Sequence, residues 1–528
     1  MTSWPQLQAG DPPADVTLLL EGTFPMVRGG VASWVNQIIQ GLPRLRFAVV
    51  FIGSEKKAYP EGILYERPDN VVHLECHYLM DTMPHRGRPR AQDGDLASFK
   101  ASDALHQYFK GATSEHPDDT IREVAQLLGR RGRLSYDSFL YSRRSWEQIV
   151  RYYREYCTDP SFVDYFWSVR NMHLPLFMLA RIARDLPASR CLHSISTGYA
   201  GFLGALARHI HGTPFFVTEH GIYTKERQID LAAADWIKPY EDVLSHGFRS
   251  DDSYIRRLWI HFFEGIGRLT YSAAHGITTL YEDNRKRQIN EGAKAERTRV
   301  IPNGIKIERF QPLRETTLYN EAPIIGLIGR VTPIKDIKTF VRAMRIVANA
   351  LPGAQGWIVG PDKEDPEYAQ ECRELADQLD LTRAVKFKGF QKTETVMAQL
   401  RLAALTSISE AQPLVALEAM ASGIPMVCTD VGSCYELIYG QVNANITAMA
   451  TPPDPRNAAG RVVPIADPGA TAEAMLTLLT DQRAWQHARA IGIERVDRHY
   501  SEQLMLDRYH RLYSEAFEAT QSTILPGP

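Results

Sequence analysis

The sequence predicts an α/β protein built from two doubly wound parallel sheets, with a helical insertion in the first half. Three features of the 528-residue chain lead to this prediction. Short apolar runs alternate with amphipathic stretches in both halves, as strands alternate with helices in such folds. A glycine-containing turn follows the first apolar run. Residues 75–185 break the alternation and are rich in aromatic side chains and arginine.

The first half opens with a strand at Val16–Leu20, a turn containing Gly29 and Gly30, and a helix from Val31 to about Leu42. Strand, glycine-rich turn and helix form the opening unit of a Rossmann-like domain. The further elements expected here are strands at Phe47–Gly53, Arg190–Ile195, Pro214–Thr218, Gly276–Leu280 and Thr298–Pro302, and a helix at Gly198–Ile210. We therefore expect an N-terminal domain over residues 1–315, with the insertion at about residues 75–185.

The second half resumes the alternation at Pro323, which implies a second parallel sheet. Its expected strands are Ile324–Ile328, Gly356–Val359, Val385–Phe387, Ala404–Ser407 and Pro425–Cys428. Its expected helices are Ile337–Ala350, Glu367–Leu379, Glu394–Leu400, Leu414–Met420 and Thr471–Leu479. This second domain should span residues 316–484. A helical pattern from Trp485 to Ala519 predicts one long C-terminal helix within residues 485–528.

The composition is that of an ordinary soluble protein, with 44% hydrophobic and 23% charged residues. A net charge of -2 gives no indication of nucleic-acid binding, so no nucleic-acid partner is expected. The six cysteines are scattered without a CxxC pair, and the N-terminus is polar, so we expect reduced thiols and a cytoplasmic protein. No apolar run reaches the roughly 20 residues of a membrane helix, so any recruitment to the inner membrane would have to come through a partner or a surface patch.

Two glutamates, Glu410 and Glu418, stand eight residues apart where a strand-like run at Leu405–Ser409 gives way to a helix. A helix that begins near Pro413 presents unpaired backbone N–H groups, at Leu414 and Val415, that suit a diphosphate. Eight residues are slightly more than two helical turns, so both carboxylates can face this end of the helix. There they could accept hydrogen bonds from sugar and ribose hydroxyls. An ordinary helix with an acidic first turn is the commoner explanation of an isolated pair.

Two cations, Arg330 and Lys335, follow the strand Ile324–Ile328. Arg and Lys in such a loop can neutralise a departing diphosphate, although an isolated surface pair is usually only solvated. Gly389, at the end of another expected strand, is a further candidate for substrate binding.

The first half offers three candidates after its strands. Gly29 and Gly30 would let the backbone approach a phosphate closely, or would simply form a turn. His220 follows the strand Pro214–Thr218 and could be a neutral hydrogen-bonding group, a capping residue or a packing residue.

Together, the spaced glutamates, the Arg-x4-Lys pair and the continuation from Glu418 to Pro425 (EAMASGIP) resemble the retaining glycosyltransferases of the GT-B fold, family 4. The resemblance implies two facing Rossmann-like domains and a C-terminal helix that returns to the first. It places Glu410 and His220 at the donor sugar and Glu418 on the ribose, and it assigns the two cations to the leaving diphosphate. It requires no metal and no cofactor besides the donor. The chain departs from the family with Ala411-Gln412-Pro413 in place of Gly-Phe-Gly, and with Asp336 in place of a glycine.

The opening loop, the insertion, the segment Glu219–Tyr223 and the segment Ser409–Pro413 are similar to the cytosolic glycosyltransferases of Pel exopolysaccharide synthesis. That similarity implies a UDP-sugar donor carrying a hexose or N-acetylhexosamine, a growing polysaccharide acceptor, and inner-membrane Pel complex proteins as partners. The donor sugar itself is not encoded in any of these motifs.

Three other functions remain open from the sequence. These are a storage-glucan or sucrose-type synthase, a nucleotide-sugar epimerase of the same architecture, and a catalytically silent nucleotide-binding scaffold. The insertion is the best candidate for acceptor or partner contact. It contains a cluster of arginines, Arg130, Arg131, Arg133, Arg143 and Arg144. This cluster could face a membrane protein or lipid, although a solvated helical face is the commoner case.

Overall fold

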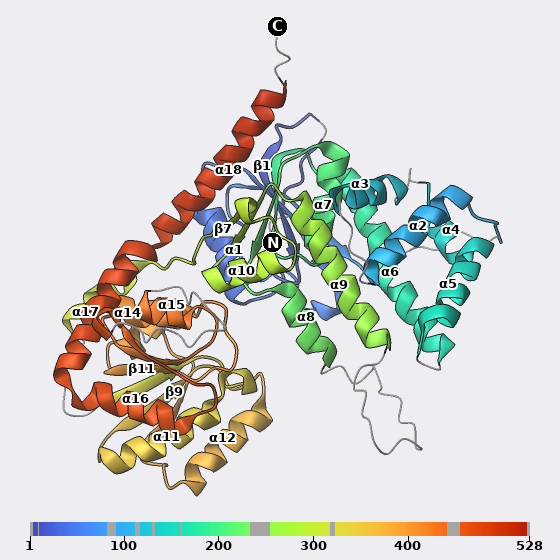
Figure 1. Cartoon of the computed structure of the whole chain (residues 1–528). Coiled ribbons are helices and arrows are strands. Elements are labelled where there is room, and N and C mark those ends of the chain that lie inside the picture. Colours follow the sequence, from blue (N-terminus) through green and yellow to red (C-terminus); the bar gives the residue numbers. More distant parts are fainter. Residues whose placement is uncertain are drawn as a thin grey trace, which may run out of the picture. The chain divides into compact units, whose positions relative to one another are not determined.

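The computed structural model describes residues 4–8, 10–81, 91–110, 117–128, 133–158, 161–232, 254–316, 323–440 and 455–524. The chain divides into two compact units (Figure 1). The first unit comprises Met1–Thr279, Arg285–Arg299 and Tyr509–Pro528, and the second comprises Leu280–Asn284 and Val300–Arg508. Each unit contains one sheet with helices packed on it, which confirms the predicted fold class of two parallel-sheet α/β domains.

The sheet of the first unit has the strand order β3-β2-β1-β4-β5-β6-β7. Its strands are β1 (Ala14–Glu21), β2 (Phe47–Gly53), β3 (Val71–Tyr78), β4 (Ser189–Ser194), β5 (Phe215–Glu219), β6 (Gly276–Thr279) and β7 (Thr298–Val300). The pairs from β3 to β6 are parallel, and Leu18 of β1 lies between Val49 and His193. The strand order reverses between β1 and β4. Ligands of open α/β sheets bind beyond the carboxyl ends of the strands at such a reversal.

The helices of the first 300 residues cover this sheet and build the insertion. They are α1 (Gly30–Gly41), α2 (Leu96–Phe109), α3 (Pro117–Leu127), α4 (Tyr136–Tyr141), α5 (Arg143–Tyr156), α6 (Phe162–Asp185), α7 (Tyr199–His211), α8 (Tyr223–Ala232), α9 (Tyr254–Ala273) and α10 (Glu282–Asn290). Figure 1 shows α2, α4, α5 and α6 gathered on one side of the unit. Phe109, Phe139 and Tyr165 of these helices belong to the same apolar core as Leu19 and Phe215 of the sheet, so the insertion is continuous with the domain.

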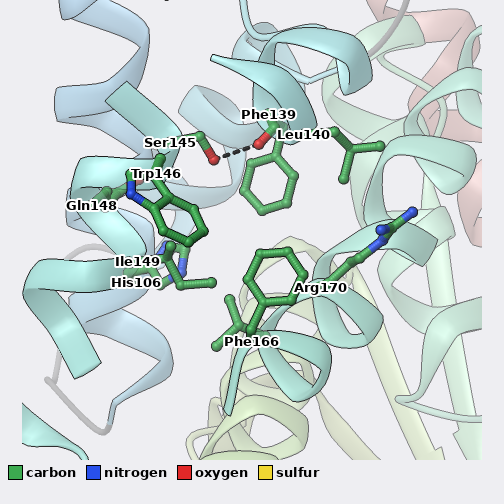
Figure 2. Close-up of a pocket in the computed structure, with 10 residues that line it drawn as sticks. His106, Phe139, Leu140, Ser145, Trp146, Gln148, Ile149, Phe166 and Arg170 are labelled. Carbon is green, nitrogen blue, oxygen red and sulfur yellow. Dashed lines mark hydrogen bonds between the residues drawn. The ribbon is translucent and has the colours of Figure 1, made fainter. Parts of the chain in front are cut away.

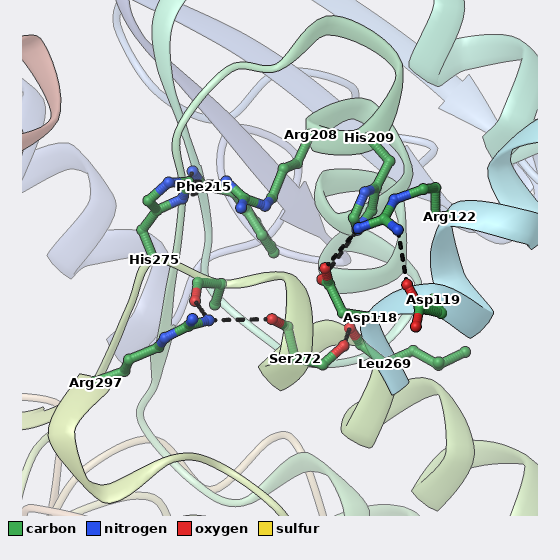
Figure 3. A network of polar contacts seen from close by, with 11 residues as sticks. Asp118, Asp119, Arg122, Arg208, His209, Phe215, Leu269, Ser272, His275 and Arg297 are labelled. Atoms are coloured by element: carbon green, nitrogen blue, oxygen red, sulfur yellow. Dashed lines mark hydrogen bonds and ion pairs between the residues drawn. The ribbon is translucent and has the colours of Figure 1, made fainter. Parts of the chain in front are cut away.

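Polar contacts link α3 to α7, and α7 to the amino ends of β5 and β6 (Figure 3). Arg208 of α7 contacts the ring of His275, just before β6, at 2.7 Å, and Phe215 N–H of β5 donates to Nδ1 of His275 at 3.3 Å. Asp118 of α3 forms an ion pair with Arg122, at 3.1 Å, and its carboxylate lies 3.3 Å from Nε2 of His209 in α7. Arg297 donates to the carbonyl oxygens of Ser272 and Ala274, at 3.2 and 3.0 Å. These contacts therefore lie at the amino ends of the strands, opposite the carboxyl ends.

The second unit repeats the topology, with the strand order β10-β9-β8-β11-β12-β13 and parallel pairing throughout. Its strands are β8 (Ile324–Ile328), β9 (Gln355–Val359), β10 (Val385–Gly389), β11 (Leu402–Leu405), β12 (Met426–Thr429) and β13 (Gly460–Val463). Its helices are α11 (Ile337–Ala350), α12 (Pro366–Gln378), α13 (Thr393–Met397), α14 (Leu414–Ala421), α15 (Cys434–Tyr439), α16 (Pro468–Thr480) and α17 (Gln482–His499). Here the order reverses between β8 and β11.

Several predicted elements differ from the structure by one to three residues in their bounds, among them Thr298–Pro302 and Glu394–Leu400, and two larger differences concern β11 and the C-terminal helix. The strand β11 ends at Leu405, and the residues that follow it form a loop rather than the predicted strand. The C-terminal pattern forms two helices, α17 and α18 (Glu502–Ile524), instead of one. The chain leaves the first helix at Tyr500, whose backbone is not helical (φ −129°, ψ 24°), and Ser501 then pairs with Ile305.

Within the first unit, the last part of α18 packs on the sheet. The hydroxyl group of Tyr513 contacts Nδ1 of His193 at 2.8 Å, and both side chains are buried. All six cysteines are free thiols. None of the helices in the described residues combines the length and the apolar character needed to cross a membrane.

We predict that Gly204→Ala destabilises the first unit. A Cβ atom at Gly204 of α7 would lie 2.1 Å from the ring of Phe215, which is fully buried in β5. Overpacking of this kind should lower the free energy of unfolding by about 1–3 kcal/mol, measured by chemical denaturation. Gly267→Ala in α9 is the matched control, because the nearest atom would be 3.4 Å away. Its stability should stay constant or rise slightly, and equal stability of both variants would contradict the prediction.

Candidate functional site

The strand reversal of the second sheet brings Lys335 and Glu410 together. Lys335 ends the short 3-10 turn Pro333–Lys335 that follows β8, and Glu410 lies in the loop that follows β11. The ammonium group of Lys335 forms an ion pair with Oε1 of Glu410, and the two side chains are only 19% and 14% exposed. Opposite charges that are held out of water in this way attract more strongly than a surface pair.

Backbone contacts between the two loops fix this ion pair. Ile408 N–H donates to Ile334 O at 2.9 Å. The hydroxyl group of Thr406 donates to the carbonyl oxygens of Lys335 and Asp336, at 3.0 and 2.9 Å. Ser407 Oγ donates to Oε1 of Glu410 at 2.7 Å. Ser407 and Lys335 both contact Oε1 of Glu410. Among the described residues no hydrogen bond is recorded at Oε2, so this oxygen can accept one from a ligand hydroxyl.

Asp336 occupies a position where the resembled family has a glycine, and its backbone conformation is one that favours glycine. Its backbone lies in the left-handed region, with φ 43° and ψ 56°. A residue with a side chain pays a steric cost there, which Asp and Asn bear best. The Asp336 carboxylate also caps α11 by accepting a hydrogen bond from Thr339 N–H at 3.2 Å. The helix cap therefore offsets part of the strain of this turn.

Close backbone packing at the same sheet edge requires glycines. Gly432 has φ +54°, and a Cβ atom there would lie 2.3 Å from Glu410 O and 2.2 Å from Ala411 O. Gly360, after β9, would place a Cβ atom 1.9 Å from Gly329 O. Gly389 has φ +64° with open space around it. The glycines thus let several loops meet beside the ion pair.

Helix α14 begins at Leu414, as predicted, and places Glu418 one turn further along. Leu414 and Val415 form the first turn, where backbone N–H groups have no partner within the helix. Burial raises the pKa of Glu418 to about 7, since the opposing effect of the nearby Arg309 is smaller. Arg309 itself is paired with Glu394, 2.8 Å from the guanidinium Nε. Glu418 therefore has different charged neighbours from Glu410.

The structure pairs Arg330 with Glu364 and not with Glu410. Its guanidinium group is about half exposed and pairs with Glu364 at 2.5 Å. Exposed pairs of this type contribute little and exchange readily for another anion.

The candidates of the first unit follow β1 and β5. Gly29 caps α1 with an extended backbone, and both Gly29 and Gly30 have open space where a side chain would stand. The ring of His220 packs against Trp34 of α1, with centroids 4.8 Å apart. Burial lowers the pKa of His220 to about 4, so its imidazole is neutral at pH 7.

Glu219, next to His220, is fully buried and satisfied by hydrogen bonds. Its carboxylate accepts from Thr197 Oγ1 at 2.9 Å, Tyr271 OH at 2.5 Å and Gln288 Nε2 at 2.9 Å. Desolvation raises its pKa. This network fixes the end of β5 and so the backbone that carries His220.

Several residues of the site were not singled out from the sequence. Ser407 and Thr406 are ordinary loop residues by type, and only the fold brings them to the ion pair. Gln412 appeared as a departure from the family, yet its side chain accepts a hydrogen bond from Asn303 N–H at 2.7 Å and ties the turn at residues 303–304 to the site loop. Among the described residues, no group of three or more His, Cys, Asp or Glu side chains is arranged to hold a metal ion.

Two family models match the chain. The model described as Domain of unknown function (DUF3492) matches residues 14–296, which is more than half of the chain. The model described as Glycosyl transferases group 1 matches residues 322–481, the segment that contains the Lys335–Glu410 pair.

Curated relatives match part of the chain. A D-inositol 3-phosphate glycosyltransferase of Nocardia farcinica is 32% identical over 27% of this chain and 34% of its own length. The corresponding protein of Acidothermus cellulolyticus is 25% identical over 52% of this chain and 59% of its own length. The chain therefore spans about a third to three fifths of these relatives.

Solved structures share the fold over nearly the whole chain. Anabaena HepE in complex with UDP is 15% identical, with a TM-score of 0.55, and covers 95% of this chain and 100% of its own. Sucrose-phosphate synthase of Thermosynechococcus elongatus is 17% identical, with a TM-score of 0.55, and covers 96% of this chain and 100% of its own. At these identities the likeness concerns the fold.

We predict that Glu418 titrates near neutral pH. Its pKa of about 7 lies above the ordinary value of 4.5, so the folded state binds its proton more tightly than the unfolded state does. The free energy of unfolding should therefore lose this contribution as the pH rises from about 4.5 through 7, by up to about 3 kcal/mol. Glu418→Gln should remove that loss, so the variant gains stability relative to wild type over this range. Carbon-13 NMR of the carboxyl group gives the midpoint directly, and a midpoint near 4.5 would contradict the prediction.

Proposed function

We propose that the chain, which belongs to the DUF3492 family and carries a group 1 glycosyltransferase domain, is a retaining glycosyltransferase that uses a UDP-sugar. The single observation that carries the proposal is the Lys335–Glu410 ion pair at the strand reversal of the second sheet. A cation suits a nucleotide diphosphate there, and a carboxylate beside it suits the hydroxyl groups of a sugar.

In this proposal the second unit holds the donor. Lys335 neutralises the diphosphate, and Arg330 joins it by exchanging its exposed pair with Glu364 for a phosphate oxygen. The first-turn N–H groups of Leu414 and Val415 bind the same anion. Glu418, with a pKa of about 7, binds the ribose hydroxyls either as acceptor or as donor. The open backbone at Gly389 leaves space for the nucleotide.

Glu410 is proposed to orient the donor sugar through its second oxygen. In the front-face route that we favour, the bond between the anomeric carbon and the diphosphate oxygen breaks. The acceptor oxygen forms its bond on the same face, and its proton passes to the departing diphosphate. The residues stabilise charge and position the reactants, and no covalent intermediate with the protein forms. No metal has a role in this scheme, because Lys335 and Arg330 carry the positive charge.

For the first unit we propose that His220 is a neutral hydrogen-bonding group for a sugar hydroxyl. Its lowered pKa, about 4, and its packing against Trp34 support a fixed, uncharged imidazole. The exposed backbone of Gly29 and Gly30 at the start of α1 is proposed to bind an anionic or hydroxyl group of the substrate.

The finer assignment is also a proposal. We propose that the sugar is a hexose or N-acetylhexosamine, that the acceptor is a growing exopolysaccharide, and that the chain is a PelF-type subunit acting with inner-membrane Pel proteins. The loop, insertion and motif similarities of the sequence support this assignment. The fold neighbour HepE binds UDP and UDP-glucose, which supports uridine as the nucleoside of the donor.

We predict that Lys335→Ala weakens UDP binding by about tenfold to a hundredfold, since it removes a charged hydrogen bond to the diphosphate. Isothermal titration calorimetry measures the affinity. Lys338→Ala is the matched control, because it removes the same charge three residues later, where Lys338 pairs with Glu371 at 2.7 Å. The single variant Lys335→Ala leaves the carboxylate of Glu410 without its ion-pair partner. The double variant Lys335→Ala, Glu410→Gln removes the same cation without leaving that charge unpaired. Unchanged affinity in both Lys335 variants would refute the donor site.

We predict that Glu410→Gln lowers the turnover of the accepted UDP-sugar by about a hundredfold or more while UDP affinity changes little. The amide keeps the size of the side chain but loses the charge that orients the sugar hydroxyl. UDP release from a panel of UDP- and ADP-sugars, with and without acceptor, measures turnover. Glu371→Gln is the control, because Glu371 is an exposed residue of α12 that pairs with Lys338. This variant should keep wild-type turnover.

The same panel separates the alternatives. Turnover that depends on a small glucosyl acceptor would favour a storage-glucan or sucrose-type synthase. A free epimerised sugar without acceptor would favour an epimerase. Nucleotide binding without turnover of any donor would favour a silent scaffold.

A further inference from the structure

The insertion exposes an aromatic surface that has no role in the proposed binding of the donor. Trp146 of α5 is 55% exposed, and Val163 and Trp167 of α6 are 62% and 47% exposed. Large apolar side chains gathered on a surface commonly mark an interaction site. These three residues, with Phe162 and Phe166, are called the α5–α6 face below.

Ring contacts make this face continuous. The ring of Trp146 lies 5.7 Å from that of Phe162 and 6.4 Å from that of Phe166. Phe166 and Trp167 are 5.5 Å apart. The half-buried phenylalanines therefore connect the two exposed tryptophans across the two helices.

A small pocket opens beside Trp146, between α4, α5 and α6, and its volume is about 50 Å³. Figure 2 shows Phe139, Trp146 and Phe166 around the space, with Ile149 at its side. The polar residues of the wall use their polar groups internally. Ser145 donates to Phe139 O, and Gln148 Nε2 donates to Asp103 Oδ1 at 3.2 Å.

Two further polar residues line the wall: Arg170, which is charged and lies over the ring of Trp167, and His106, which is uncharged. Its ring stacks on His173 at 4.4 Å, and burial lowers the pKa of His106 to about 4. The pocket therefore offers contact surface mainly to hydrocarbon.

Helix α5 places arginines beside this apolar surface, and acidic side chains pair with two of them: Arg143 pairs with Asp93 and Glu147, and Arg151 pairs with Asp103. Helix α5 has four arginines (Arg143, Arg144, Arg151 and Arg154) and two glutamates (Glu147 and Glu155), whereas the whole chain has a net charge of -2. Arg143 and Arg151 are about half exposed, and their ion pairs can exchange for lipid phosphates. Arg170 lies over the ring of Trp167, 4.9 Å from its centroid. Arg130 and Arg131 of the predicted cluster lie outside the described residues.

We propose that the α5–α6 face binds an anionic lipid surface, with Trp146 and Trp167 inserted between the lipid headgroups. Amphipathic helices that combine arginines with exposed tryptophans bind at the boundary between lipid headgroups and acyl chains. The anionic headgroups suit the arginines of α5, and the exposed rings suit the apolar layer below the headgroups. This proposal is independent of the proposed transferase activity.

The test is flotation of the full chain with vesicles of phosphatidylcholine alone or mixed with phosphatidylglycerol. We expect binding to the mixed vesicles that weakens with salt, and a loss of at least about tenfold in the double variant Trp146→Ala, Trp167→Ala. Ile346→Ala is the control, because Ile346 is 42% exposed on α11 of the second unit. It should bind as the wild type does.

Tryptophan fluorescence with chain-brominated lipids tests the same contact in variants that keep an aromatic ring. Quenching should fall in Trp146→Phe, Trp167→Phe and persist in Trp357→Phe, a change at a buried position of the second unit. Three results would overturn the proposal: no binding to anionic vesicles, equal binding of the alanine double variant, or quenching that is independent of Trp146 and Trp167. Binding only to membranes that retain their proteins would also overturn it, in favour of a protein partner.

Discussion

The candidate site depends on one constraint, the reversal of strand order between β8 and β11. It lets the two loops after these strands lie side by side, where Thr406 and Ile408 join them through backbone carbonyls. That junction holds the cation of Lys335 against Glu410. A partly buried pair of this kind is weak evidence of stabilisation, because desolvation offsets much of the Coulomb attraction. Its position at the ligand-binding edge of the sheet therefore says more about function than about folding.

The neighbouring residues make sense as adaptations to this junction. Asp336 accepts a left-handed backbone so that α11 can start directly after Lys335, and it recovers part of the cost by capping the helix. Gly432 and Gly360 allow backbone contacts that any side chain would prevent. Gln412 occupies a position where the related family has a small glycine-rich segment, and it uses its amide to hold the backbone of Asn303. The residues that depart from the resembled motif thus hold the loop with contacts of their own.

The sequence predicted most of the framework because apolar periodicity is local. The strands Phe47–Gly53 and Ile324–Ile328 and the helix Ile337–Ala350 have the predicted bounds. The strand β3 escaped prediction because it is the edge of its sheet, where His73, Glu75 and His77 interrupt the apolar run. The break between α17 and α18 contains neither glycine nor proline, and it depends on the pairing of Ser501 with Ile305. In the site, motif spacing identified Lys335 and Glu410, but the contacts of Ser407, Gln412 and Glu364 arise only when distant segments meet.

Three features of the chain lower its stability, and different ligands could compensate for them. Asp336 has a strained backbone, Glu418 is a carboxyl group raised to a pKa of about 7 by burial, and Trp146 and Trp167 expose large rings to water. Local rules of folding are broken most often where function requires it. Asp336 and Glu418 belong to the unit that contains the group 1 glycosyltransferase domain, so a bound nucleotide sugar could compensate for both. The tryptophans lie on the insertion of the first unit, and a ligand of the second unit would leave them exposed. The proposed lipid contact would cover them, and the arginines of α5 suit its anionic headgroups.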